Sequence, residues 1–331
     1  MGFKKRIKDV NILLLFKTSI GATMAILIAN RLGLAYGATA GIITLLTIQN
    51  TKKETISIAI RRTLAFFVAV IIAYIIFSNF GYTTIAFGGF VFIFVASCSI
   101  LGLKDGIIMN AVLTTHFLTE QSMYYTLVLN EITLLLLGIS IGIIINLIMP
   151  KHDEEISRQQ KIVEHQIKNV LFYIASILKG EEGQFVGEKD RSSSYFYKLD
   201  RILENLLVKS YEEAGNRLLT DTKYQISYLE MRKRQIVVLK DMMKNVEDFN
   251  IVLPQSIMIS NYLERAADAF DEFNNVEDLL LEQKQLLESF KDEELPSSRE
   301  EFENRAILFQ VSRDLEYFLQ IKRKFVKKRI K

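Results

Sequence analysis

The chain has 331 residues, half of them hydrophobic, and its charged residues are unevenly divided between two parts. Residues 1–150 carry 11 Lys and Arg against 5 Asp and Glu, a net charge of +6, whereas residues 151–331 carry 30 against 33, a net charge of −3. The one cysteine, Cys98, excludes an internal disulfide framework and is expected to be a small packed side chain.

A break in composition divides the chain near residue 150. Twelve of the 16 glycines lie in the first 150 residues, and glycine is more frequent in membrane helices than in soluble ones. Pro150 follows the last long apolar run, and a charged stretch begins directly after it. We therefore predict a transmembrane domain over residues 1–150 and a soluble domain over residues 151–331.

The first domain contains six apolar segments, at residues 12–29, 36–49, 63–80, 83–103, 106–118 and 124–149. The first, third, fourth and sixth segments are long enough, as helices, to span a hydrocarbon core of about 30 Å. The second and fifth are short: the second has 14 residues, which reach only about 21 Å as a helix. We expect the ends of these short helices to lie below the lipid surface, at the edges of polar vestibules.

Basic residues in the connections predict the orientation of the chain. One side of the predicted membrane domain carries nine of them, Lys4, Lys5, Arg6, Lys8, Lys52, Lys53, Arg61, Arg62 and Lys104. The opposite side has only Arg31. By the positive-inside rule the N-terminus is cytoplasmic, and six crossings place the C-terminal domain in the cytoplasm too. The basic residues fall on one side only if both short segments cross the membrane. This agreement with the positive-inside rule indicates that both segments do cross.

The short segments take the second place in each half of a three-plus-three arrangement. An odd number of crossings per half gives an inverted repeat, and short segments at matching positions point to a transport site. Aligning the two short segments pairs Thr44 with Thr114. The spacings Gly37-x-x-x-Gly41 and Gly138-x-x-x-Gly142 also predict that helices approach closely.

Ionisable side chains within the apolar segments are candidates for function. Lys17, His116 and Glu131 are of this kind, and a charge at the centre of a membrane helix costs at least about 2.5–3.5 kcal/mol. His116 and Glu131 fit either an ordinary place near the outer boundary or proton exchange. Lys17 fits either a functional role or a side chain that reaches the headgroups. Four neutral polar residues accompany them, namely Gln49, Asn110, Asn130 and Asn146, and the asparagines are expected to form interhelical hydrogen bonds.

The second domain is predicted to be all-α, because no strand alternation competes with its helical periodicity. Apolar residues from Val163 to Ile177 recur at steps of three and four residues. A loop is expected around glycines 180, 183 and 187 and residues 192–194. Further helices are expected at 195–214, 217–248, 255–274 and 276–293, and a last one after the capping-box pair Ser298 and Glu301.

The chain ends with the basic stretch KRKFVKKRIK. On a domain tethered to a membrane, this stretch fits contact with the anionic headgroups of the lipid bilayer, and it equally fits a solvated helix end. The net charge of −3 on the domain argues against nucleic acid as a partner. The sequence shows no phosphate-binding glycine loop, nucleophile elbow or metal-ligand cluster, so we expect a protein that is not an enzyme and binds no cofactor or metal.

The stretch KTSIGATMAILIANRLGLAYGATAGIITLLTIQNTKKETISIAIRR resembles the aromatic acid exporter family, part of a larger group that includes the fusaric acid resistance proteins. Members of the family tend to have Lys-Thr in the first helix, Tyr-Trp-Ala at the start of the second, Gln near its cytoplasmic end and Arg at the start of the third. The matching residues are Lys17-Thr18, Tyr36, Ala38, Gln49 and Arg62. The chain departs from the pattern at Gly37, where Trp is common, and at Ala65 and Ala69, where glycines are usual.

The resemblance implies export of aromatic carboxylates or related organic anions across the bacterial plasma membrane, by a homodimer or a higher homo-oligomer that is driven by the proton gradient. The layout is also similar to that of plant aluminium-activated malate transporters, which are anion channels. An organic-anion channel is therefore an alternative function. A third hypothesis is a membrane-anchored interaction protein that acts through its cytoplasmic helices. For transport, we expect Lys17 and Arg62 to attract the carboxylate and His116 or Glu131 to relay protons. The candidate substrate path is lined by Lys17, Tyr36, Thr44, Gln49, Arg62, Asn110 and Thr114.

Overall fold

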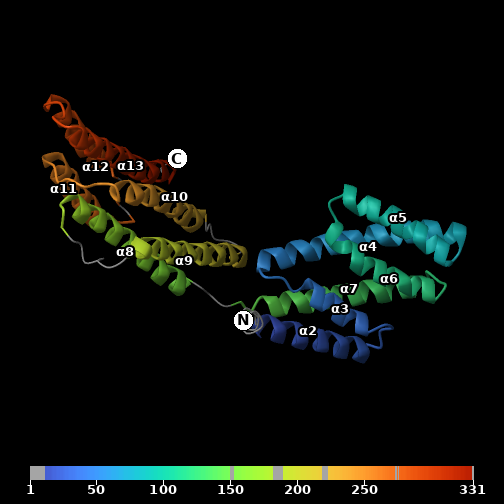
Figure 1. Ribbon diagram of the computed structural model, residues 1–331. Coiled ribbons are helices and arrows are strands. Elements are labelled where there is room, and N and C mark those ends of the chain that lie inside the picture. The colour runs from blue at the N-terminus through green and yellow to red at the C-terminus, as the bar shows by residue number, and fades with distance from the viewer. Residues whose placement is uncertain are drawn as a thin grey trace. The chain divides into compact units, whose positions relative to one another are not determined.

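Figure 1 shows the chain as a computed structural model, which describes residues 12–149, 153–181, 189–217, 223–272, 274 and 276–329. Every regular element within these residues is a helix, which confirms the all-α class. The chain divides near residue 150 into two compact units, called the N-terminal unit and the C-terminal unit. The helices of the N-terminal unit are α2 (Ile12–Arg31), α3 (Ala38–Thr47), α4 (Lys52–Phe80), α5 (Thr84–Ile100), η1 (Lys104–Gly106), α6 (Ile107–Thr119) and α7 (Tyr125–Asn146).

The two halves of the N-terminal unit pack in the same way. Helices α2 and α3 pack on each other and on α7, whereas α5 and α6 pack on each other and on α4. Helices α4 and α7 also contact each other, and α2 and α5 lie on opposite sides of the unit (Figure 1). Exchanging the first three helices for the last three leaves this scheme unchanged, so the packing agrees with a three-plus-three repeat.

Glycines allow the short helix α3 to approach its neighbours closely. A Cβ atom at Gly138 would lie 2.7 Å from the carbonyl oxygen of Ala40, and one at Gly142 would lie 2.9 Å from Cβ of Thr47. On the other side of α3, a Cβ atom at Gly41 would lie 2.7 Å from Cγ1 of Ile26. Both glycine spacings are therefore confirmed as sites of close helix packing.

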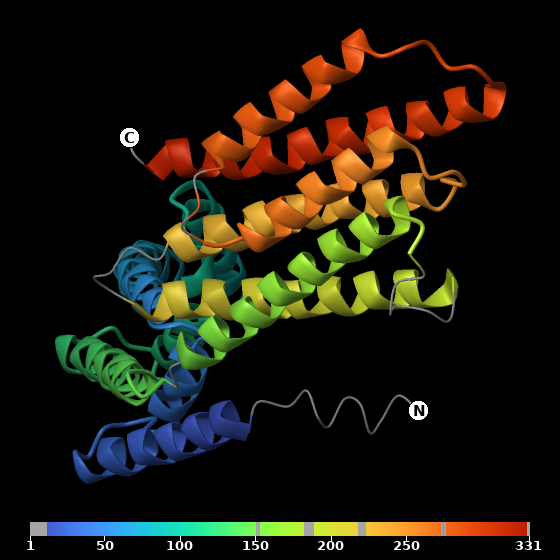
Figure 2. The ribbon, with the colours of Figure 1, turned by 90° about the vertical axis from the view of Figure 1, so that its left-hand side faces the viewer.

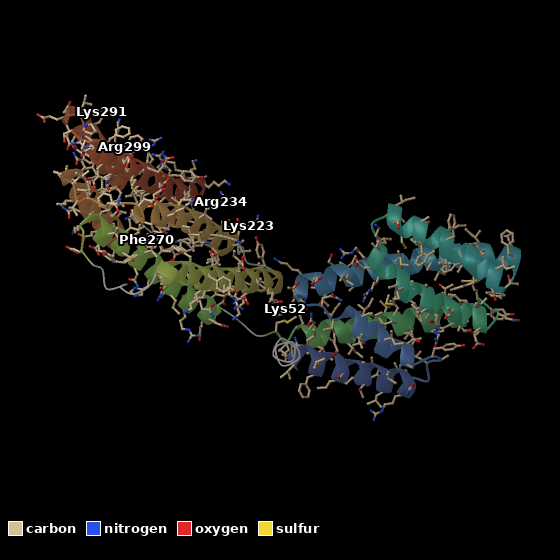
Figure 3. The ribbon with its side chains drawn as sticks, in the orientation of Figure 1. Lys52, Lys223, Arg234, Phe270, Lys291 and Arg299 are labelled. Atoms are coloured by element: carbon tan, nitrogen blue, oxygen red, sulfur yellow. The ribbon has the colours of Figure 1, made fainter. Side chains whose placement is uncertain are left out.

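Two helices differ in extent from the sequence prediction. Helix α4 has 29 residues and begins at Lys52, whose position is marked in Figure 3, so Arg61 and Arg62 lie on a helix rather than in a connection. Thr51 caps its N-terminus by accepting a hydrogen bond from the backbone N–H of Glu54. Helix α5 has only 17 residues, because the chain turns at Gly102 with a φ of 71°. The fourth segment is thus shorter than predicted.

Among the described residues, three helices are long and apolar enough to cross a membrane: α2, α4 and α7. Helices α3 and α5 are shorter apolar helices. Large apolar side chains such as Ile85, Phe92 and Ile108 are exposed on the surface of the unit. An apolar surface of this extent suits contact with lipid rather than with water.

The C-terminal unit is a helical bundle (Figure 2). Its helices are α8 (Asp153–Leu178), α9 (Lys189–Asn216), α10 (Lys223–Val246), α11 (Pro254–Asp268), α12 (Glu277–Ser289), η2 (Phe290–Asp292) and α13 (Arg299–Arg329). Helix α10 packs on α13 and on α8, and α11 packs on α8. Helices α12 and α13 run back along each other, and Lys291 and Arg299 lie at the end where α12 leads into α13 (Figures 2 and 3). One continuous apolar core, from Ile156 to Ile321, joins these helices.

Several helix ends in this unit correct the sequence prediction. Residues 192–194 belong to α9 rather than to a loop, and α11 ends at Asp268 rather than at 274. Glycines 183 and 187 lie outside the described residues. Before α13, Ser298 accepts a hydrogen bond from the N–H of Glu301 as predicted, whereas the carboxylate of Glu301 accepts from Ser297.

The basic C-terminal stretch is partly built into the fold, and its last two residues lie outside the described part. Lys322 is only 2% exposed, and its ammonium group donates to the carbonyl oxygen of Glu272. Arg323 and Lys327 each lie within 4 Å of the carboxylate of Glu277. Lys322 is thus built into the fold, whereas Arg323 and Lys327 form ion pairs at the surface. Contact of the stretch with the headgroups of a bilayer stays a prediction.

Candidate functional site

Two groups of polar side chains, most of them buried or half-buried, lie in the N-terminal unit, at opposite ends of the short helices α3 and α6. The first, the His116 cluster, consists of Tyr36, His116, Glu120, Asn130 and Glu131. The second, the Arg62 cluster, consists of Thr47, Arg62, Asp105 and Asn110. Each short helix contributes to both clusters, because Tyr36 precedes α3 and Thr47 ends it, and Asn110 and His116 lie on α6.

A buried His–Glu pair is the centre of the first cluster. Nδ1 of His116, in the last turn of α6, lies 2.7 Å from Oε2 of Glu131, in the second turn of α7. Glu131 is 0% exposed and His116 only 7% exposed. A carboxylate is costly to bury alone, and a neighbouring imidazole offsets this cost by sharing a proton with it. The pair is therefore able to hold one exchangeable proton inside the unit.

Asn130 anchors the loop before α3 to this pair. Its amide nitrogen donates to Oε1 of Glu131 at 3.0 Å and to the carbonyl oxygen of Ala35 at 3.0 Å. Its amide oxygen accepts from the N–H of Ala35 at 2.9 Å. The side chain of Asn130 thus forms two hydrogen bonds to one residue of the loop, which fixes the backbone next to Tyr36 against α7.

Tyr36 covers one face of the His116 ring. The two ring centroids are 3.9 Å apart and the ring planes differ by only 5°. The hydroxyl of Tyr36 donates to Oε1 of the exposed Glu120 at 2.7 Å. Its backbone has a φ of 58°, in the left-handed region that non-glycine residues rarely adopt. A strained backbone at a stacked side chain is a feature that clusters at functional sites.

Arg62 is the centre of the second cluster and is only 7% exposed. Its Nε donates to the backbone carbonyl oxygen of Asp105 at 3.1 Å, and its Nη1 lies 3.4 Å from Oγ1 of Thr47. The carboxylate of Asp105 instead pairs with Nε of the neighbouring Arg61 at 2.5 Å. Within the described part of the chain, no carboxylate forms an ion pair with Arg62. Its guanidinium therefore keeps donors available for an anion.

Asn110 ties α6 to this arginine. Its amide nitrogen donates to the carbonyl oxygen of Arg62 at 3.1 Å, and its buried amide oxygen has no hydrogen-bond partner. Asn146, on α7, likewise donates to the carbonyl oxygen of Gln49 and to Oγ1 of Thr55. Together with Asn130, these contacts confirm the asparagines as residues that link helices and loops.

The remaining predicted path residues are not all brought together. Thr44 is buried between α3 and α7, where its hydroxyl donates to the carbonyl oxygens of Ala40 and Gly138. Thr114 is buried on α6 and donates to the carbonyl oxygen of Asn110. Lys17 lies apart from the Arg62 cluster: it is 7% exposed, and its Nζ donates to Sδ of Met149 at 3.3 Å.

Two charged members of the clusters were missed by the sequence analysis. Asp105 lies in the turn between α5 and α6, which its glycines mark as a loop, and Glu120 follows directly after α6. They are two of only five acidic residues in the first 150, and that scarcity was the signal that could have found them. No group of three His, Cys, Asp or Glu side chains placed to hold a metal ion is found among the described residues.

The N-terminal unit defines a helical membrane protein with ionisable side chains buried between its helices. Comparison with known families then identifies the family. Residues 13–149 match "Aromatic acid exporter family member 1", and residues 153–323 match "Putative aromatic acid exporter C-terminal domain". The chain therefore belongs to the aromatic acid exporter family, a family of membrane transporters.

Two similar proteins extend this comparison. The uncharacterized protein YqjA of Bacillus subtilis strain 168 is 28% identical over 309 residues, which cover 93% of this chain and 94% of that protein. The crystal structure of a "putative membrane protein from Clostridium difficile 630" matches 52% of this chain and 99% of its own chain, with 28% identity and a TM-score of 0.44.

Proposed function

We propose that this protein exports aromatic carboxylates from the cytoplasm, in exchange for protons that enter through the His116–Glu131 pair. The pair carries the proposal, because it is a proton-binding group buried between the helices of a unit that belongs to an exporter family. Proton exchange there needs only small movements, since the imidazole and the carboxylate already share one hydrogen bond at 2.7 Å.

The substrate enters, in this proposal, at the Arg62 cluster. The excess of basic residues on that side of the unit supports a position near the cytoplasmic face. The guanidinium of Arg62 attracts the carboxylate, because it carries a charge that no carboxylate of the described chain neutralises in an ion pair. The His116 cluster then faces the outside, where the proton concentration is higher in a respiring bacterium.

The two clusters are close enough for coupling. Asn110 and His116 are six residues apart on α6, which is about 9 Å along the helix axis. A substrate that leaves the Arg62 cluster therefore has only about 9 Å to travel before it reaches the proton-binding pair. Over this short distance, a bound substrate anion affects proton binding to the pair, and a bound proton affects substrate binding.

The proposed role of the His116–Glu131 pair in proton exchange is tested with Glu131→Gln in inside-out proteoliposomes. The assay follows uptake of labelled 4-hydroxybenzoate driven by an imposed pH gradient. Glutamine keeps the shape of the side chain and cannot carry the proton, so we expect gradient-driven uptake to fall at least about tenfold. Exchange of labelled for unlabelled substrate without a gradient should persist. Glu54→Gln, an exposed carboxylate at the start of α4, is the matched control and should behave like the wild type.

The proposed role of Arg62 in substrate binding is tested by comparing two neighbouring arginines in the same assay. Arg62→Lys should raise the half-saturating substrate concentration about tenfold, because an ammonium group cannot reproduce the planar fork of the guanidinium. Arg61→Lys should change it little, because the half-buried Arg61 is already paired with Asp105. Absence of uptake across a panel of aromatic carboxylates would contradict the proposed function. Gradient-independent flux that appears as stepwise currents in planar bilayers would indicate an anion channel instead.

A further inference from the structure

The ring of Tyr36 occupies a position that suits a flat aromatic ligand. We propose that the face of His116 under Tyr36 is the binding site for the aromatic ring of the exported molecule, and that Tyr36 fills this site when no substrate is there. The inference rests on the proposed function, because it names the part of the site that selects aromatic over saturated carboxylates.

The stacking geometry is the first support. The rings of Tyr36 and His116 lie parallel, with their centroids 3.9 Å apart. Parallel stacking uses the whole face of each ring and requires both partners to be flat. The imidazole is held in this orientation at its edge, because Nδ1 is hydrogen-bonded to Glu131. A benzene ring in place of Tyr36 makes the same contact, whereas a puckered cyclohexane ring does not.

The attachment of Tyr36 is the second support, because the ring can leave without disturbing the fold. The two hydrogen bonds between Asn130 and Ala35 hold the backbone on one side of Tyr36, and α3 begins two residues after it. The half-buried ring is retained by the stack, by contact with the edge of the apolar core and by one hydrogen bond to the exposed Glu120. Rotation about the side-chain bonds of Tyr36 therefore uncovers His116 while the loop stays in place.

The charges around the ring site define how the substrate lies. Glu120 and Glu131 both flank it, the first at the hydroxyl of Tyr36 and the second at Nδ1 of His116. Two carboxylates disfavour a third at this point, so the carboxylate of the substrate points away from them, toward the Arg62 cluster. During export, the aromatic ring thus moves ahead of the carboxylate. The site then recognises the ring, and Arg62 recognises the charge.

The absence of tryptophan from the sequence allows a direct test. Tyr36→Trp introduces a single tryptophan whose emission reports whether the indole is stacked on His116 or released. The purified variant in nanodiscs is titrated with benzoate and with cyclohexanecarboxylate, two acids of matched charge and similar size. We expect benzoate to change the emission in a saturable manner and cyclohexanecarboxylate to leave it unchanged. Tyr125→Trp, at an exposed position on α7, should respond to neither acid.

A second variant keeps the test decisive if the larger indole is poorly accommodated. Tyr36→Phe retains the stack and loses the hydrogen bond to Glu120, so its ring is displaced more easily. In transport, its half-saturating concentration for benzoate should fall several-fold. An unchanged or higher value would count against displacement of this ring.

The outcomes separate this inference from the proposed function. Benzoate transport by Tyr36→Trp without an emission change, or an equal response to both acids, overturns the ring site and leaves the exporter function standing. An emission change specific to benzoate in a protein that transports no aromatic acid supports the ring site and overturns the exporter function. If the protein shows no transport of aromatic acids and no emission change with benzoate, both the ring site and the exporter function are overturned.

Discussion

At the residue scale, the C-terminal unit contains two buried cations in one aromatic environment. The guanidinium of Arg232, which is 1% exposed, lies 4.0 Å from the ring centroid of Phe270 and donates to the hydroxyl of Tyr228 and to Oε1 of Gln235. The ammonium of Lys322 lies 5.3 Å from the ring centroid of Tyr228. Burial, followed by the nearby charge of Arg232, lowers the pKa of Lys322 from its ordinary value of 10.5 to about 8.

This shift predicts an unusual pH dependence of stability. Because the folded state binds the proton of Lys322 less tightly than the unfolded chain does, the free energy of unfolding rises with pH between about 8 and 10.5. The gain is up to about 3 kcal/mol, and it is absent below pH 8, where the ammonium must be buried in its charged form. Burial also raises the pKa of Tyr228, so this neighbour stays protonated over the same range.

The measurement is urea unfolding of the fragment 151–331 at pH values from about 8 to 10.5. The apolar core of this fragment consists of its own residues only. Lys322→Met should lose the rise in stability with pH that the wild type shows. Lys324→Met removes an exposed lysine two residues away on the same helix and should keep the wild-type pH profile. A wild-type stability that is flat or falling between pH 8 and 10.5, in parallel with the Lys322→Met variant, would contradict the buried charge.

At the scale of the element, the position of α3 depends on the glycines that face it. Gly138→Ala should force α3 away from α7, because the added Cβ atom would lie 2.7 Å from both the carbonyl oxygen of Ala40 and Cβ of Ile43. Overpacking of this kind costs about 1–3 kcal/mol. The thermal midpoint of the detergent-purified protein should therefore fall. Gly88→Ala is the matched control: a Cβ atom at Gly88 meets no atom within 4 Å, and its midpoint should stay the same or rise slightly.

The elements also show how far the sequence alone could lead. Apolar periodicity predicted the helices, because burial and lipid contact both follow from side-chain type. It set the start of the third segment at 63 instead of Lys52, since polar helical turns look like a connection when only hydropathy is followed. For the same reason, the lengths of α5 and α11 were overestimated: Gly102 and the residues after Asp268 end these helices through local backbone geometry.

The site was less predictable than the helices. His116 and Glu131 were both selected as membrane-embedded ionisable groups, but their pairing depends on how α6 and α7 pack, which spacing along the chain does not determine. Tyr36 was selected from a family pattern that gives no indication of its stacking on His116. The orientation of each side chain within the clusters is a product of tertiary packing, and residue identity alone does not encode it.

At the scale of the whole molecule, the distribution of basic residues predicts six crossings with both termini in the cytoplasm. Helix α3 has ten residues and covers only about 15 Å, so it crosses only if the polar groups at its ends are hydrated below the lipid surface. The Gln49–Asn146–Thr55 contacts at one end and the His116 cluster at the other supply such groups. Crossing by the short helices is therefore the feature on which the transport mechanism depends.

Cysteine accessibility in intact cells tests the crossings one by one. Cys98 is buried and is replaced by alanine, which leaves a chain without cysteine. Single cysteines are then placed at exposed positions, namely Leu32, Asn50, Leu101, Tyr124 and Leu295. A membrane-impermeant maleimide should label the variants at 32 and 124 in intact cells. It should label those at 50, 101 and 295 only after permeabilisation. Labelling of 32 and 50 from the same side would show that α3 does not cross. For α6 the corresponding pair is 101 and 124, and either result would remove the short helix concerned from the transport path.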